Sequence, residues 1–274
     1  MKHLALTVVV ATVLTGCSIS NPIGSATGPQ SRSHVFVIVL ENAGYSDAIR
    51  VPYVADLAKQ YAQVTDYHAI AHPSLPNYLA LTSGSTWGIR DDDYHALPRG
   101  GIGQQLTERR LPWRAYMEGM GDDCMSGGKR YAVKHNPFAY FGGGCPSNVV
   151  PMSQLDTDLA KSTPRLAWIT PDQCHDGHDC GSDEVEAFLR GLVPRILSSS
   201  AWRQDGLLLI TWDEDDSDLE GNHVMTLVIA PHLTAHQSSE PYDHYSLLAT
   251  VEDRLGLSRL GEAAGAKPFK DLLD

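Results

Sequence analysis

The sequence is poor in basic residues. Its 274 residues include 21 Lys and Arg against 33 Asp and Glu, which gives a formal net charge of -12 at pH 7. A nucleic-acid partner requires a basic stripe that neutralises phosphates, and the sequence shows none. The scarcity of positive charge therefore argues against a nucleic-acid-binding surface.

Long apolar runs are scarce too. The stretch from residue 4 to residue 14 follows a basic start, but it is too short for a stable membrane anchor and predicts a secretion signal. It ends in "LTGC", residues 14–17, which resembles the cleavage box of bacterial lipoproteins, in which the cysteine is lipidated. We therefore expect residues 1–16 to be a lipoprotein-type signal peptide and a lipidated Cys17 to hold the exported protein on the outer side of a bacterial membrane. An ordinary signal peptide followed by secretion is the alternative.

The next segment lacks the periodic apolar residues of a packed core. Residues 17–33 are rich in Ser, Gly and Pro and predict a flexible tether. Beyond it we find neither a second linker nor an internal repeat, so residues 34–274 are expected to form a single domain.

Cysteines are few. Four remain after Cys17, an even number that favours disulfides in an oxidising compartment: Cys124, Cys145, Cys174 and Cys180. Three pairings are possible, and proximity in the sequence favours the first two together and the last two together. The alternative for the last two is a zinc site with His175 and His178, but this spacing is cramped for a four-ligand structural zinc.

Buried strands are indicated by four short apolar runs rich in β-branched residues, which are His34–Leu40, Arg165–Thr170, Gly206–Trp212 and Thr226–Ala230. Helical spacing predicts helices between them, at Pro52–Ala62, Ser182–Ser199 and Tyr242–Leu257. Alternating strands and helices predict a doubly wound α/β fold, with a mostly parallel sheet and helices on both faces.

Polar residues follow three of these strands: Glu41 and Asn42, Asp172, and Asp213 and Glu214. Ligands of open parallel sheets bind beyond the carboxyl ends of the strands, so we expect one shared site at that edge. A lone Asn42 or Asp172 would more often serve as a turn or cap residue, and it is the recurrence at three strands that indicates a site.

The stretch "HPSLPNYLALTSG", residues 72–84, fixes a serine between two prolines and leads into a helix expected to start near Asn77. Ser74 would lie at the helix N-terminus, where free N–H groups and the helix dipole favour an anion such as a phosphoryl group. A helix cap is the simpler role for such a serine.

Serine needs a base or a metal ion to become a nucleophile. The carboxylates of Glu41, Asp213 and Glu214 and the amide oxygen of Asn42 are oxygen ligands suited to a divalent cation. Other acidic runs, at Asp91–Asp93 and in "HDGHD", are typical of solvated surface unless a metal neutralises them.

Five separated blocks carry a family resemblance. "ENAGY", "HPSLPNYLALTSG", "PDQCHDGHD", "TWDEDD" followed by "NHV", and "YDHYSLLATVED" occur in the order seen in the bacterial phosphoesterase family of acid phosphatases and phospholipases C. That family is a branch of the alkaline phosphatase superfamily, and the chain is most similar to its small secreted acid phosphatases. The resemblance runs from His34 to about Gly256.

The resemblance implies a mechanism. Ser74 attacks the phosphorus of a small phosphorylated substrate, a phosphoserine forms, and a metal-activated water hydrolyses it. Asn77 binds a phosphoryl oxygen. The implied metal ligands are Glu41, Asn42, Ser74, Asp213 and Glu214.

Histidines in the same blocks are candidates for binding phosphate, protonating the leaving group or completing a second metal site. They are His72, His178, His223 and His244. A hydrogen-bonded structural histidine is the simpler role for each one.

The number of metal ions stays open. The two-metal pattern of the superfamily has an aspartate followed four residues later by a histidine, whereas Asp172 is followed by Asp176. Asp176 is still a candidate ligand, and we expect one or two ions of Mg²⁺, Ca²⁺ or Zn²⁺.

Hydrolysis of phosphate monoesters is the expected activity, since the short chain leaves little room for a lipid-binding extension. A phosphodiesterase or phospholipase C is the first alternative. A serine esterase that uses Asp243 and His244, or a non-catalytic metal-binding lipoprotein, are alternatives of other classes.

The segment from Trp87 to Asn148 reads as a long Gly-rich insertion near the active edge. Its Lys129, Lys134 and His135 are able to attract phosphate, but basic residues on a loop are more often solvated.

Overall fold

The computed structural model describes residue 1 and residues 32–216 and 221–273. The predicted signal peptide, Cys17 and all but the last two residues of the predicted tether lie outside the described residues. Among the helices described, none is long and apolar enough to cross a membrane. The described residues from 32 onward belong to one compact unit.

An eight-stranded sheet runs through this unit in the order β5-β4-β6-β1-β7-β8-β2-β9. Its strands are β1 (His34–Leu40), β2 (Ala62–Val64), β4 (Trp113–Met117), β5 (Val149–Pro151), β6 (Leu166–Thr170), β7 (Gly206–Trp212), β8 (Thr226–Ile229) and β9 (His236–Ser238). A separate two-stranded sheet pairs β3 (Tyr67–His68) with β10 (Tyr242–Asp243). β8 runs antiparallel to its neighbours β7 and β2, whereas the other pairs of the large sheet are parallel.

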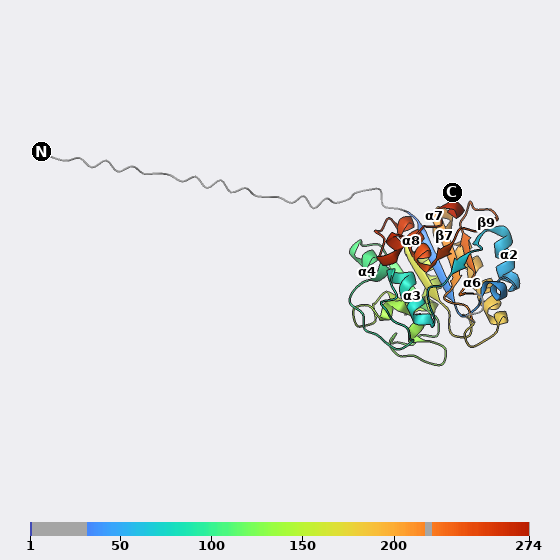
Figure 1. The fold of residues 1–274 in the computed structure, drawn as a ribbon, viewed down its shortest axis with the longest axis horizontal. Coiled ribbons are helices and arrows are strands. Elements are labelled where there is room, and N and C mark those ends of the chain that lie inside the picture. The colour runs from blue at the N-terminus through green and yellow to red at the C-terminus, as the bar shows by residue number, and fades with distance from the viewer. Residues whose placement is uncertain (2–31, 217–220, 274) are drawn as a thin grey trace. The chain divides into compact units, whose positions relative to one another are not determined.

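Helices cover both faces of the large sheet (Figure 1). The α-helices are α1 (Tyr45–Ala48), α2 (Pro52–Gln60), α3 (Ser74–Ser83), α4 (Gly101–Glu108), α5 (Leu155–Lys161), α6 (Ser182–Ser198), α7 (Ser200–Asp205), α8 (His244–Leu255) and α9 (Lys270–Leu273). Short 3-10 helices are η1 (Val133–His135), η2 (Pro137–Ala139), η3 (Met152–Gln154) and η4 (Gly261–Ala264). α2 packs against α6 on one face, and α3 packs against α4 and α8 on the other. The predicted doubly wound fold is therefore confirmed.

The central strands owe their position to their sequence. All seven residues of β1 and all seven of β7 are buried, which only a strand covered on both faces allows. β6 and β7 flank β1 in parallel, so the three strands predicted to end in polar residues are direct neighbours.

The segment from residue 87 to residue 148 differs from the predicted insertion, because it contributes α4 and the sheet strand β4. Neither element is evident from the sequence, because β4 carries a charged Arg114 and α4 contains Gly101 and Gly103. Gly103 is required because a Cβ atom there would lie 2.9 Å from the Trp113 ring. The glycine therefore marks close packing of α4 on β4.

The helix that carries the predicted nucleophile begins at Ser74, three residues before the predicted start. Pro76 fits in its first turn because the missing N–H has no intrahelical partner at that position. The helix ends at Gly84, whose φ of 69° is left-handed, and a Cβ atom there would lie 2.2 Å from the Leu260 carbonyl oxygen. Every residue of α3 is buried.

Both disulfides predicted by proximity are present. Cys124 pairs with Cys145, and Cys174 pairs with Cys180. The second bond removes the two thiolates that the alternative zinc site would need. It instead closes the loop that carries Asp176 and His178.

Candidate active site

Neighbouring strands bring the predicted metal ligands together. The parallel register pairs Leu40 with Trp212, so Glu41 and Asp213 leave the sheet side by side. The Asp213 amide continues this alignment by donating to the Leu40 carbonyl oxygen at 2.9 Å. The sequence prediction that both acids share one edge of the sheet is therefore confirmed.

Ser74 lies at the N-terminus of α3 and faces these acids. Its hydroxyl lies 3.1 Å from Glu41 Oε2 and 3.2 Å from Glu214 Oε1, and it donates a hydrogen bond to one of them. Its side chain belongs to the buried core of the domain, with 1% of its surface exposed. The arrangement places the Ser74 hydroxyl between two carboxylates and the positive end of a helix dipole.

Burial makes the negative charge of these acids costly. Burial first, and then the charge of Asp213, raise the pKa of Glu41 well above its usual value. Burial and the charge of Glu214 do the same for the pKa of Asp213, and burial raises the pKa of Glu214. Buried carboxylates this close need protons or a cation to neutralise them.

The buried oxygens near these acids that lack a hydrogen-bond partner include Asn42 Oδ1 and Asp213 Oδ2. Asn42 holds a left-handed backbone conformation, with φ of 35°, and its Nδ2 donates to Glu214 Oε1 at 3.2 Å. The Asn42 amide oxygen is therefore available to bind another partner. Carboxylate and amide oxygens without partners are the donors that a hard divalent cation requires, so the residues present fit such an ion.

His135 lies between Glu41 and Asp176. Its Nε2 is 3.3 Å from Glu41 Oε1, and its Nδ1 is 3.4 Å from Asp176 Oδ2. His135 Nε2 and Asp176 Oδ2 are buried without a hydrogen-bond partner. These three side chains could hold a metal ion, and they share Glu41 with the site at Ser74.

The titration of this cluster is dominated by burial. Burial lowers the pKa of His135 well below its usual value, with the charge of Lys134 acting in the same direction. Burial raises the pKa of Asp176 to about 7. The sequence prediction that residues of this basic stretch are solvated is wrong for His135, which is 2% exposed.

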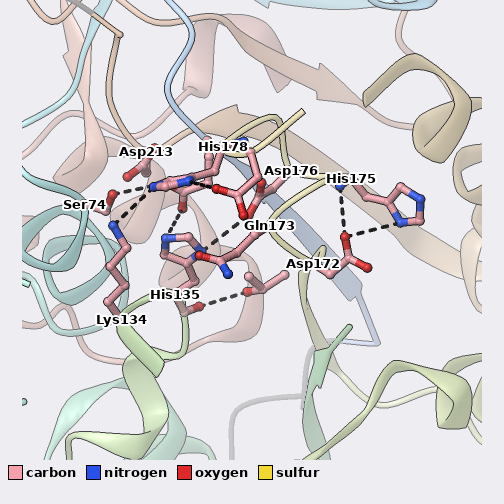
Figure 2. A network of polar contacts seen from close by, with 12 residues as sticks. Ser74, Lys134, His135, Asp172, Gln173, His175, Asp176, His178 and Asp213 are labelled. Carbon is pink, nitrogen blue, oxygen red and sulfur yellow. Dashed lines mark hydrogen bonds and ion pairs between the residues drawn. The ribbon is translucent and has the colours of Figure 1, made fainter. Parts of the chain in front are cut away.

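Lys134 and His178 lie beside Ser74 (Figure 2). The Lys134 ammonium is 2.8 Å from Asp92 Oδ2 and 3.5 Å from His178 Nε2. Figure 2 shows the side chains of Ser74, Lys134 and His178 pointing toward one another, with His135 and Asp176 next to them. They place a cationic and an imidazole group beside the Ser74 hydroxyl (Figure 2).

His72 contacts Glu214 and the neighbouring Asp215. Its Nδ1 is 2.6 Å from Glu214 Oε2, and its Nε2 is 3.5 Å from Asp215 Oδ1. About a third of the His72 side chain is exposed, so the ring links the buried acids with solvent.

Asn77 and His223 have other partners in this structure. Asn77 Oδ1 accepts hydrogen bonds from the amides of Ile70 and Ala71, at 3.0 and 2.9 Å. His223 Nε2 donates to the Thr65 carbonyl oxygen at 3.0 Å. Both side chains stabilise the loop before the nucleophile, and their roles toward a phosphoryl group stay predictions.

His244 is fully buried and both of its ring nitrogens are engaged. Nδ1 lies 2.9 Å from Tyr67 Oη, and Nε2 donates to the Asp213 carbonyl oxygen at 2.6 Å. Asp243 caps α8 by accepting from the Ser246 amide. This arrangement fixes the turn that carries Asp213 and disfavours an esterase in which His244 serves as the base.

Sequence reasoning missed Tyr78 and Asp92. Tyr78 follows the nucleophile by one helical turn, and its hydroxyl donates a short hydrogen bond to Glu41 Oε1. The i, i+4 spacing from Ser74 is the signal that places both hydroxyls on one face of the helix. Asp92 lay in an acidic run that was assigned to the surface.

A second group of ligand-type side chains lies near the ends of β4 and β6: Glu118, Asp172 and His175. Asp172 Oδ1 accepts hydrogen bonds from the amides of Cys174 and His175. Glu118 Oε2 accepts from the Asp172 amide and lies 2.9 Å from the His175 ring. Asp172 is thus a turn residue, the simpler role considered for it.

Comparison with known proteins shows the family of this chain. The model of the Phosphoesterase family matches residues 30–258. A phosphatidylinositol-3-phosphatase of Mycobacterium tuberculosis is 31% identical over 254 residues, which cover 88% of this chain and 82% of that protein. An acid phosphatase of Aspergillus fumigatus is 28% identical over 88% of this chain, and a phosphate-repressible acid phosphatase of Penicillium chrysogenum is 30% identical over 86%. The chain spans only 58% and 62% of the length of these two fungal relatives.

Solved structures share the fold at low identity. A protein of the alkaline phosphatase superfamily from Vibrio parahaemolyticus superposes with a TM-score of 0.61 at 12% identity, covering 89% of this chain and 72% of that one. Murine ectonucleotide pyrophosphatase/phosphodiesterase 5 gives 0.59 at 11% identity, covering 88% and 99%.

Proposed function

The chain belongs to the phosphoesterase family, and from this premise we propose that it is a metal-dependent phosphatase that hydrolyses phosphate monoesters through a phosphoserine on Ser74. One observation carries the proposal. The Ser74 hydroxyl lies 3.1 and 3.2 Å from two buried carboxylates at the N-terminus of a helix. A serine that merely caps a helix has no need of such neighbours.

The residues that would hold the cation are Glu41, Asn42, Ser74, Asp213 and Glu214. A bound divalent ion, Mg²⁺, Ca²⁺ or Zn²⁺, supplies positive charge that stabilises the serine alkoxide and the charge on the phosphoryl oxygens. Asp176 and His135, with Glu41, fit a second ion, so we propose one or two per chain.

The side chains around Ser74 divide the remaining work. As Ser74 Oγ attacks phosphorus, its proton passes to Glu41 or Glu214, both within hydrogen-bond distance. The bond from phosphorus to the leaving oxygen breaks, and His178 donates the proton that this oxygen requires. Lys134 binds the phosphoryl oxygens. Water then attacks the phosphorus of the phosphoserine and gives its proton to His178. The bond from phosphorus to Ser74 Oγ breaks, Ser74 takes back the proton from the carboxylate, and inorganic phosphate is released.

His72 completes the proton path. Since its Nδ1 is 2.6 Å from Glu214 and its ring is partly exposed, it can pass a proton from that carboxylate to solvent. The same contact holds Glu214 toward Ser74.

The substrate is a monoester in this proposal, because the relatives are named acid phosphatases and a phosphatidylinositol-3-phosphatase. Phosphodiesterase or phospholipase C activity is the alternative. Hydrolysis rates on p-nitrophenyl phosphate, bis(p-nitrophenyl) phosphate and a phosphatidylcholine distinguish phosphatase, phosphodiesterase and phospholipase C activity.

We further propose that the protein is exported, which its two disulfides support, and that a lipidated Cys17 anchors it to a membrane.

A test uses Ser74→Ala, with Ser83→Ala at the other end of the same buried helix as control. With ³²P-labelled monoester and acid quenching, the wild type and the control are expected to trap label on protein, and Ser74→Ala is expected to trap none. Folding is verified by circular dichroism.

Loss of activity with EDTA, restored by added cation, supports metal dependence. Turnover by folded Ser74→Ala, or activity that survives EDTA, contradicts the proposal and favours an esterase-type enzyme. If the wild type hydrolyses none of the phosphate esters, the result favours the alternative of a non-catalytic metal-binding module.

A further inference from the structure

Asp92 connects the nucleophile helix with the loop that carries Lys134. Its Oδ1 accepts a hydrogen bond from the Leu75 amide at 3.0 Å, and its Oδ2 accepts one from Lys134 Nζ at 2.8 Å. Both donors are neighbours of Ser74, because Leu75 follows it in α3 and the Lys134 side chain points toward it (Figure 2).

These donors are the ones that an incoming phosphoryl group requires. Pro76 has no N–H, so the Leu75 amide is the donor next to the nucleophile in the first turn of α3. Lys134 is the cation beside it. An anion at a helix N-terminus gains from both the amide and the dipole, and a carboxylate gains from them as a phosphate does.

We infer that Asp92 is an internal competitor for the phosphoryl group: its carboxylate takes the Leu75 amide and Lys134, and so limits how tightly the site retains inorganic phosphate. The inference rests on the proposed function. It assigns to Asp92 a part in specificity and turnover and leaves the chemical step to Ser74.

Position and charge both support this role. Residues 91–93 form bends outside any helix or strand, and 30% of the Asp92 side chain is exposed, so the carboxylate has room to withdraw. Its carboxylate carries a negative charge beside the two donors, the Leu75 amide and the Lys134 ammonium. Phosphate bound at Ser74 is repelled by the same charge. Release of product limits many hydrolytic enzymes, and a competing carboxylate speeds that release.

The test compares Asp92→Asn with the wild type, both as full chains loaded with cation. Asparagine keeps the oxygen that accepts from the Leu75 amide and removes the charge. The inhibition constant of inorganic phosphate is expected to fall about tenfold, since Lys134 is freed for a charge-assisted bond to phosphate. The turnover number is expected to fall with it, and the dissociation constant of phosphate, measured by calorimetry, to fall in parallel.

Asp91→Asn is the matched control. Asp91 precedes Asp92 in the same segment and is exposed. Its Oδ1 lies 2.6 Å from His95 Nε2, and this contact is outside the candidate site. Its phosphate inhibition constant is expected to match the wild type. Lys134→Met in the Asp92→Asn background is expected to abolish the gain, because the freed partner is then absent.

Phosphate inhibition of folded Asp92→Asn that is unchanged or weaker overturns the inference, and would make Asp92 a support for Lys134. Asp92→Ala, which also removes the carboxylate, is expected to tighten phosphate binding likewise and covers the case of a misfolded Asp92→Asn. A wild type without phosphatase activity would refute the proposed function itself, whereas an active wild type with no tightening in either variant refutes only the competitor role.

Discussion

The His135 imidazole lies 3.3 Å from the Glu41 carboxylate, measured from Nε2 to Oε1, although the two residues come from a 3-10 helix and from the end of the central strand. Tyr78 stacks on the same ring at 5.4 Å. The ring is thus held against the carboxylate by packing, and it links a segment far along the chain with the nucleophile.

His135→Gln is expected to lower cation affinity about 10- to 100-fold, since it removes a nitrogen that lies against the ligand Glu41. The measurement is activity on p-nitrophenyl phosphate as a function of free cation, together with the metal content of the purified protein. His236→Gln, on the exposed end of β9, serves as control. Equal cation affinity in the two variants would remove His135 from the metal site.

Asp213→Asn is expected to abolish activity, by roughly 10³-fold or more, because a ligand of the cation is lost. In EDTA the same variant is expected to melt about 3 to 8 °C above the wild type, because one buried, like-charged carboxylate is gone. Differential scanning calorimetry measures this. A cation-free variant that melts below the wild type would show that Asp213 stabilises the fold without any ion.

The cation-free protein is expected to lose stability as the pH rises from about 4 to 8. The pKa of Asp176 is raised to about 7 from an ordinary 3.8, so over this window the folded chain keeps a proton that the unfolded chain has released. The raised pKa values of Glu41 and Asp213 act in the same direction. Asp176 alone accounts for roughly 4 kcal/mol. Urea unfolding at several pH values in EDTA measures the slope, and added cation is expected to flatten it. A slope of the opposite sign contradicts the assignment.

The disulfide between Cys174 and Cys180 is expected to matter more for activity than for stability. Its loop is short, so replacing both cysteines by serine costs about 2 kcal/mol of unfolding free energy, against about 3 kcal/mol for the Cys124 pair. The short loop carries Asp176 and His178, however, and the turnover number is expected to drop at least about tenfold. The Cys124/Cys145 double serine variant is the control. Equal loss of activity in both variants would argue against a positioning role for the shorter bridge.

Strong, continuous apolar runs made the centre of the sheet predictable. β1 and β7 have the predicted bounds, since burial on both faces leaves an unmistakable run of branched residues. β4 was missed because it is short and carries Arg114. α6 runs through Pro194 and ends at Ser198, one residue before the predicted end.

The acids of the candidate site were predictable because each follows a strand directly. Glu41 and Asp213 are predictable in this way, and Ser74 from its place between two prolines, whereas His135 and Asp92 have the sequence context of solvated residues. Both of these lie in loop sequence without periodicity, and only tertiary packing brings them to the site. The spacing of residues along the sequence does not predict such tertiary contacts.

α3 is enclosed along its whole length, from Ser74 to Ser83, so the proposed nucleophile belongs to the interior and not to a surface loop. Amide hydrogens of such a helix exchange with solvent only when the entire domain opens. Heat inactivation and global melting are therefore expected to coincide. The protein would then have no partly active form on its way to denaturation.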